Sequence, residues 1–167
     1  MKEALNLPCL YKVILNPNRN SYHFTTSSKA EYEVLFTFDN NLFSGTELEG
    51  FGVYSVAINK VQTGSGGADP EIQKTIFSIL NHFFKDRNRV LTYVYDSMDG
   101  KELFRKRLFQ IWESKFRNNS EILKVDGIIH SEDMEYQSGI IFHSKNSIGS
   151  EKVRKAFNDV LDLLRQK

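Results

Sequence analysis

A glycine-rich segment, Gln62-Thr63-Gly64-Ser65-Gly66-Gly67, stands just before the helix-opening pair Asp69-Pro70. Backbone N–H groups at a helix entrance attract anions, and glycines let a ligand approach the backbone closely. The N–H groups of Thr63–Gly67 are therefore predicted to form a phosphate or pyrophosphate site. A flexible surface connection between a strand and a helix has the same composition. An ionised Asp69 at the helix terminus would also repel an anion.

Arg105 is the second residue whose position suggests chemistry. On a helical wheel it falls inside an apolar stripe made by Phe104, Leu108, Phe109, Ile111, Trp112 and Phe116. A guanidinium there needs a partner, because an unpaired buried charge is costly. It could act as an internal clamp that pairs with Asp96 or Asp99. Alternatively it could hold a phosphate or carboxylate at the carboxyl end of the preceding strand.

The histidines form no local metal-binding signature, so the sequence predicts no metal site. They stand at positions 23, 82, 130 and 143. His130 and His143 could meet across a hairpin near the end of the chain, but one pair does not make a site.

No residue is assigned a catalytic role by a motif. The chain has neither a Gly-x-Ser-x-Gly elbow nor a complete P-loop, and Cys9 lies in a proline-flanked segment without an obvious base. Glu33 and Tyr54 are the residues that could contribute a general base.

The elements around the glycine-rich segment follow a β-α-β pattern. Residues Val53–Val61 read as a strand, and Asp69-Pro70 opens a helix. The near-continuous apolar run Val90–Tyr95 is typical of a strand covered on both faces, as in a parallel pair. Asp99 and Glu102 have the spacing of a capping box, which predicts a second helix to about residue 117.

The flanking segments complete the expected fold. Strands are predicted at Tyr11–Leu15, Ser21–Thr26, Glu31–Asp39, Glu121–His130 and Met134–His143, with a polar loop at Asn40–Gly50. Tyr32, Val34, Phe36 and Phe38 would share one face of their strand. Ser150 is expected to cap a last helix with an apolar stripe of Val153, Phe157, Val160, Leu161 and Leu164. Residues 1–167 are thus predicted to form a single α+β domain with a mixed sheet, in the order β-β-β-β-α-β-α-β-β-α.

This order of elements and the Gln62–Gly67 motif resemble the Gcn5-related N-acetyltransferases. Their motif, Gln/Arg-x-x-Gly-x-Gly/Ala, leads from a strand into a helix and binds the pyrophosphate of coenzyme A. The resemblance implies coenzyme A or acetyl-coenzyme A as cofactor, with an amine attacking the thioester carbonyl. The chain departs from the pattern at Ser65, where the family has glycine. Phe104 and Phe109 stand where the family often has a tyrosine general acid.

A second resemblance covers the middle of the chain. It is carried by Asp69-Pro70-x-Ile72-x-x-Thr75-Ile76, Phe83-Phe84, Tyr95-Asp96-x-x-Asp99-Gly100 and Arg105-x-Arg107-Leu108-Phe109-x-x-Trp112. These motifs resemble an uncharacterised bacterial family, a domain of unknown function. Tyr95 stands where that family has Cys, and Lys101 where it has Arg. The resemblance implies no reaction.

Bulk properties narrow the classes of partner. The 167 residues include 22 basic and 21 acidic ones, so the global charge gives no argument for nucleic acid or an anionic membrane. The single cysteine excludes an intrachain disulfide, and no apolar run is long enough to span a bilayer. We therefore expect a cytoplasmic protein; its partners and oligomeric state are not indicated.

Two functions are compatible with these observations. One is an acyl-coenzyme A-dependent N-acyltransferase, which would need a gap between the strands that end near Val61 and Tyr95. The other is a non-catalytic binding or interaction module, in which the glycine-rich loop and Arg105 have structural roles.

Overall fold

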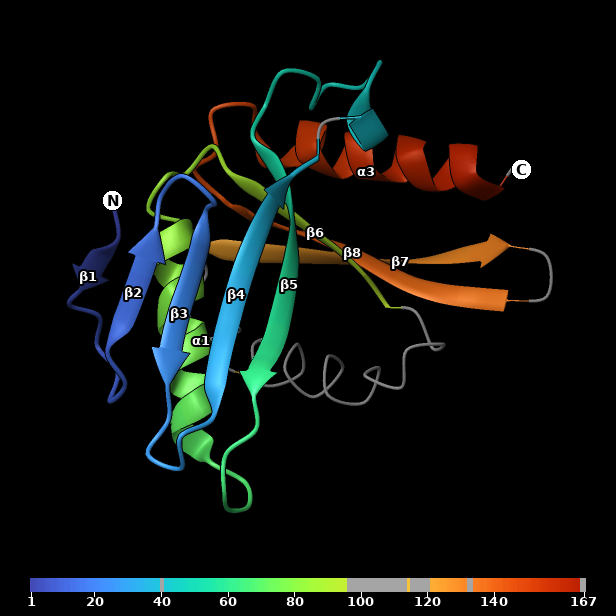
Figure 1. Ribbon diagram of the computed structural model, residues 1–167. Coiled ribbons are helices and arrows are strands. Elements are labelled where there is room, and N and C mark those ends of the chain that lie inside the picture. Colours follow the sequence, from blue (N-terminus) through green and yellow to red (C-terminus); the bar gives the residue numbers. More distant parts are fainter. Residues whose placement is uncertain (40, 96–113, 115–120, 132–133, 166–167) are drawn as a thin grey trace. The chain divides into compact units, whose positions relative to one another are not determined.

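The computed structural model describes residues 1–39, 41–95, 114, 121–131 and 134–165 (Figure 1). Its strands form one mixed sheet of eight strands in the order β1-β2-β3-β4-β5-β6-β8-β7. The chain divides into two compact units, each described separately below. Unit 1 comprises Met1–Thr37 and Val56–Lys85, and unit 2 comprises Phe38–Ser55 and Asp86–Lys167. The predicted α+β class is confirmed, and the single-domain assignment stays a prediction.

Unit 1 is built on antiparallel strands. They are β1 (Glu3–Leu5), β2 (Val13–Asn16), β3 (Ser21–Thr25) and most of β4 (Glu31–Phe38), joined by the greater part of β5 (Val53–Gln62). Strand β1 was not expected from the sequence, because three residues are too few to show an alternating pattern.

Helix α1 (Pro70–Phe83) packs on one face of these strands, behind them as drawn in Figure 1. Ile76, Ile79, Leu80 and Phe83 are buried, as the helical spacing predicts. The ring of Phe83 stacks on Phe36 of β4 at 4.1 Å between centroids. Since α1 covers only one face, the viewer in Figure 1 sees the opposite face of β2–β4.

The alternation predicted along β4 holds for three of the four apolar residues that were expected to share one face. Tyr32, Val34 and Phe36 are buried, whereas Phe38 is 58% exposed. Phe38 is the last residue of the strand and belongs to unit 2. Its ring meets the edge of Tyr54 at 5.6 Å and does not enter the core.

Unit 2 contains the parallel pair that the apolar run at 90–95 suggests. The start of β5 pairs in parallel with β6 (Val90–Tyr95), from Val53 opposite Val90 to Ser55 opposite Thr92. Residues 90–93 are all buried, which agrees with a strand covered on both faces. Strands β7 (Ile122–Ser131) and β8 (Met134–His143) form the predicted hairpin, and β8 lies antiparallel to β6.

Helix α3 (Ser150–Arg165) packs through its predicted apolar stripe onto the core of unit 2. The helix already includes Ser150, so the expectation that this residue caps it from outside was one position off. The short 3-10 helix η1 (Asn41–Phe43) lies where only a polar loop was predicted. Phe43 and Leu48 are fully buried in the same core as Val153 and Phe157, so this segment is more than a surface loop.

Candidate functional site

The glycine-rich loop connects β5 to α1 and packs against the turn between β3 and β4. A Cβ atom added to Gly64 would lie 2.4 Å from the carbonyl oxygen of Ser28 and 2.5 Å from the nitrogen of Ala30. These are backbone atoms, which cannot move aside as a flexible side chain can. Gly64 is therefore required for close approach of two backbone segments of the same chain.

Hydrogen bonds fix the same contact. The Ser65 N–H donates to the Ser28 carbonyl at 3.0 Å. Within the turn, the Ala30 N–H donates to Thr26 Oγ1 at 3.0 Å, and the Thr26 N–H donates to the Ala30 carbonyl at 2.9 Å. One of the N–H groups predicted to bind an anion is thus engaged by the protein itself.

Asp69 occupies the N-terminus of α1. Its carboxylate accepts a hydrogen bond from the Glu71 N–H at 2.9 Å, as an N-cap does. The second carboxylate oxygen accepts a bond from the Tyr11 hydroxyl at 2.5 Å. The predicted capping role is confirmed. The carboxylate lies where an anion would otherwise meet the helix terminus.

Asp96, Asp99, Phe104, Arg105 and Phe109 lie outside the described residues, as does the second predicted helix apart from Ser114. The two roles suggested for Arg105, an internal clamp and a site for a phosphate or carboxylate, both stay predictions.

Tyr54, one of the two candidate bases, lies in unit 2. Its ring contacts Phe38 edge-on, and the guanidinium of Arg89 lies 5.8 Å from the ring centroid. Thr92 Oγ1 donates to the Tyr54 carbonyl at 3.3 Å. The contacts with Phe38 and Arg89 give the ring a packing role.

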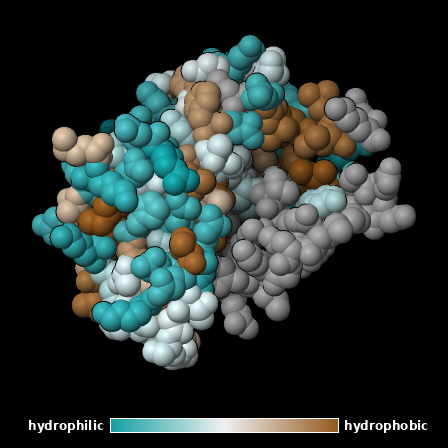
Figure 2. Space-filling model, viewed as in Figure 1, coloured by the Kyte–Doolittle hydropathy of each residue, from teal (hydrophilic) through white to brown (hydrophobic). Residues whose placement is uncertain are grey.

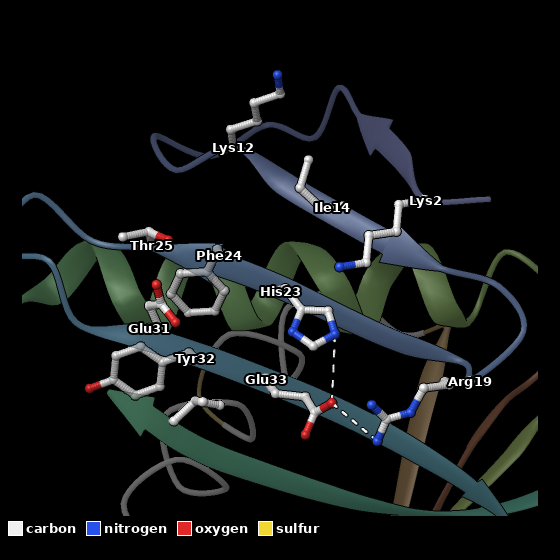
Figure 3. Close-up of a pocket in the computed structure, with 11 residues that line it drawn as sticks. Lys2, Lys12, Ile14, Arg19, His23, Phe24, Thr25, Glu31, Tyr32 and Glu33 are labelled. Atoms are coloured by element: carbon white, nitrogen blue, oxygen red, sulfur yellow. Dashed lines mark ion pairs between the residues drawn. The ribbon is translucent and has the colours of Figure 1, made fainter. Parts of the chain in front are cut away.

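A pocket of 710 Å³ opens on unit 1, on the face of β2–β4 opposite α1 (Figure 3). It is lined by charged and polar side chains with a few apolar ones: Lys2, Lys12, Ile14, Arg19, His23, Phe24, Thr25, Glu31, Tyr32, Glu33 and Val61. This lining includes Glu33, the other candidate base. Seen from the same side as Figure 1, the surface of unit 1 is mostly hydrophilic with isolated apolar residues (Figure 2).

Strand pairing explains why these side chains meet. Ile14 of β2 lies opposite His23 of β3, and His23 lies opposite Glu33 of β4. One pleat along, Thr25 lies opposite Glu31. Alternate residues of a strand point to the same face, so both rows project away from α1. The same alternation that buries Tyr32 and Val34 therefore places Glu31 and Glu33 in the pocket.

The Glu33 carboxylate is held by three neighbours. Arg19 Nη2 lies 3.8 Å from its Oε1, and His23 Nε2 lies 3.6 Å from the same oxygen (Figure 3). Asn59 Nδ2 donates to Oε2 at 3.5 Å. The Glu33 side chain is only 12% exposed, so these partners offset much of the cost of desolvating its charge.

Ser21, His23 and Glu33 have the residue types of a hydrolase triad but not its geometry. Ser21 Oγ lies 3.0 Å from His23 Nε2, the same nitrogen that faces Glu33. A charge-relay arrangement needs the acid and the hydroxyl on different ring nitrogens. Ser21 is also fully buried and cannot reach a substrate. We therefore assign no nucleophile to this cluster.

Three charged groups of the pocket make no ion pair with any residue that the structure describes. Among the described residues, no ion pair joins Lys2, Lys12 or Glu31 to another side chain. In Figure 3 the Lys2 ammonium points over β2 toward His23, whereas the Lys12 ammonium points outward. Lys2 thus places positive charge over the pocket, and the exposed Lys12 lies at its rim. Glu31 places a carboxylate on β4 that has no ion pair within the described residues.

His130 and His143, which could have met across the hairpin, do not pair. In the β7–β8 hairpin, His130 lies opposite Glu135 and His143 lies opposite Ile122, at the two ends of the ladder. Within the described residues, no group of three or more His, Cys, Asp or Glu side chains could hold a metal ion.

In the same parts of the chain, no helix combines the length and apolar character needed to cross a bilayer.

Sequence reasoning named Glu33 but missed the rest of the pocket. The available signal was the polar half of the alternation in 21–25 and 31–35, which reads as a solvated strand face. Lys2, Lys12 and Arg19 come from three other segments, and only the order of the strands brings them together.

A search of curated proteins found no match to this chain. A protein-family comparison matched residues 68–159, more than half of the chain, to the family described as "Family of unknown function (DUF6169)". The matched range contains the motifs from Asp69 to Trp112 that suggested an uncharacterised family. The chain therefore belongs to DUF6169, a family of unknown function.

Proposed function

We propose that this protein is a binding module whose pocket on β2–β4 takes a small polar ligand that carries at least one anionic group. The observation that carries the proposal is the pair of ammonium groups, Lys2 and Lys12, that lack an ion pair within the described residues at the edge of a 710 Å³ pocket. A pocket of this size lies within the range of small-molecule sites. The Ser21–His23 geometry supports binding without catalysis.

The binding free energy available from ion pairs indicates that the ligand also needs apolar contacts. Exposed ion pairs contribute about 0.2–1 kcal/mol each, so two or three of them supply at most about 3 kcal/mol. A micromolar dissociation constant requires about 8 kcal/mol. The remainder has to come from apolar contact, which Ile14 and Val61 offer at the pocket wall. We therefore expect a ligand with a hydrocarbon part and dissociation constants in the millimolar range for simple anions.

A second proposal keeps the acyl-coenzyme A-dependent N-acyltransferase. Its support is the loop's place between β5 and α1, together with the parallel pairing of β5 and β6. In the described part of the chain, no hydrogen bond is made by the N–H groups of Gly66 and Gly67, which could face a pyrophosphate. The Asp69 cap, the engaged Ser65 N–H and the tight packing of Gly64 weigh against it.

Amide NMR of the full chain separates the two proposals. Hexanoate at millimolar concentration should shift the resonances of Ile14, His23 and Thr25, while coenzyme A and acetyl-coenzyme A should leave Ser65–Gly67 unchanged. The double variant Lys2→Gln/Lys12→Gln should weaken hexanoate binding several-fold. Lys152→Gln, an exposed lysine of α3, serves as the matched control. Unchanged pocket resonances with hexanoate would rule out the binding proposal. Shifts confined to the loop with coenzyme A would favour the transferase.

A further inference from the structure

We propose that the pocket of unit 1 recognises a zwitterion of the α-amino-acid type with an aliphatic side chain. The ligand's carboxylate would lie toward Lys2 and Lys12, and its ammonium toward Glu31. This inference rests on the proposed binding function and narrows the class of ligand.

The first argument is that charge is segregated across the strands. Lys2 precedes β1 and Lys12 precedes β2, whereas Glu31 lies on β4. Strand β3 separates the two sides, because the order is β1-β2-β3-β4. The pocket therefore has a positive side and a negative side, and a ligand with one sign of charge would meet repulsion at one of them.

The register gives the distance between the two sides. Thr25 lies opposite Glu31, and Ile14 lies opposite His23. Continuing the β2–β3 register by two residues places Lys12 beside Thr25. Neighbouring strands are about 4.8 Å apart, so the backbones of Lys12 and Glu31 are about 10 Å apart. Thr25, on the intervening strand β3, lines the pocket between them.

The second argument is that Glu33 and Glu31, the two carboxylates of the pocket, differ in their partners. Glu33 is already held by Arg19, His23 and Asn59. Glu31, in contrast, is exposed, and no ion pair is found for it among the described residues. Glu31 is therefore the carboxylate that remains to receive a ligand ammonium.

The third argument concerns the apolar part of the ligand. Ile14 and Val61 line the pocket, and Val61 is 60% exposed although it is a large apolar residue. A branched aliphatic side chain placed against Val61 would remove apolar surface from water on both partners. Leucine fits this combination of two charges and one aliphatic group, so it is a suitable probe.

Three ligands that differ by one group each test the inference. They are leucine, 4-methylpentanoate, which lacks the amino group, and 3-methylbutylamine, which lacks the carboxylate. Amide NMR titrations of the full chain should show leucine bound several-fold more tightly than either analogue. Each analogue lacks one charged group, and an exposed charge contact of up to about 1 kcal/mol corresponds to a factor of up to about five.

Single substitutions test which side chain contacts the ammonium of the ligand and which contacts its carboxylate. Glu31→Gln should weaken leucine several-fold and leave 4-methylpentanoate unchanged or bound more tightly. Lys12→Gln should weaken leucine and 4-methylpentanoate but not 3-methylbutylamine. Glu47→Gln and Lys152→Gln are matched exposed controls in unit 2 and should change none of the three affinities.

The outcomes separate this inference from the proposed function. If 4-methylpentanoate binds as tightly as leucine, or if Glu31→Gln leaves leucine binding unchanged, the zwitterion is excluded and the anion-binding module stands. If none of the three ligands shifts Ile14, His23 or Thr25, both proposals are overturned.

Discussion

The loop that joins β5 to α1 and the pocket over β2–β4 belong to the same unit, yet they use their polar groups in opposite ways. In the loop, Gly64 and Ser65 make contact with the β3–β4 turn, and the helix terminus behind them is occupied by Asp69. In the pocket, Lys12 and Glu31 face solvent, with no ion pair found in the described parts of the chain. Glycine content therefore indicates close packing here, and unpaired charge is the better guide to a ligand.

The largest effect that tests this contrast is expected at Gly64. Gly64→Ala places a methyl group against the Ser28 and Ala30 backbone and should lower the free energy of unfolding by about 1–3 kcal/mol. Gly67→Ala is the matched control, because nothing lies near its Cβ position and its φ is not in the left-handed region. Urea denaturation of both variants measures the difference. Equal stabilities would show that the loop is not packed as described.

A somewhat smaller effect is expected at the cap. Asp69→Ala removes the bond from the Glu71 N–H and leaves the Tyr11 hydroxyl without its acceptor, which should cost about 1–2 kcal/mol. Asn caps helices about as well as Asp, so Asp69→Asn should remain close to the wild type. Thermal melts of the two variants provide the test. A stable alanine variant would argue that the carboxylate is not held by the protein and could make way for an anion.

The pH dependence of folding stability is expected to depend on His143, which lies outside the pocket. Burial lowers the pKa of His143, partly opposed by Glu121, so the folded state favours the neutral ring. The unfolded chain then binds more protons, and the stability contribution is present above about pH 6.5 and is lost as pH falls toward the folded pKa. His143→Gln should flatten this dependence in urea titrations between pH 7 and 5. An unchanged slope would assign the acid response to groups other than His143.

The smallest change in stability is expected at Glu33. Glu33→Gln keeps the shape of the side chain but removes its charge, which leaves Arg19 and His23 without their anion. We expect a loss of up to about 1 kcal/mol, because these contacts are long and Arg19 is largely exposed. Anion binding should become tighter as the pocket becomes more positive. A loss of several kcal/mol would instead assign Glu33 a mainly structural role.

Elements with local signals were predictable from the sequence. The start of α1 follows from Asp69-Pro70, because capping chemistry is encoded within a few residues. The parallel pairing of β6 follows from its near-continuous apolar run. In contrast, β1 consists of three residues that become a strand only by pairing with β2. Phe38 breaks its strand's alternation because its neighbour Tyr54 lies outside the core.

The candidate site was harder to predict because it, too, depends on contacts between segments that are distant in the sequence. Its positive groups come from separate segments at Lys2, Lys12 and Arg19, and no spacing in the sequence links them. Their meeting depends on the order of β1 to β4, which alternation alone does not determine. The glycines were conspicuous because they are adjacent in the sequence, yet Gly64 faces a turn more than thirty residues earlier.

The hydrogen bonds of Asp69 and the packing of α1 also limit where the chain can be truncated. The family match starts at residue 68, whereas Tyr11, which holds the Asp69 carboxylate, and Phe36, which stacks on Phe83, both precede it. A fragment excised at residues 68–159 would expose the buried side of α1 to water and lose the strands that cover it. We therefore expect that the part of the chain matched by the family will not fold alone, and domain swaps or truncations should retain the strands that precede it.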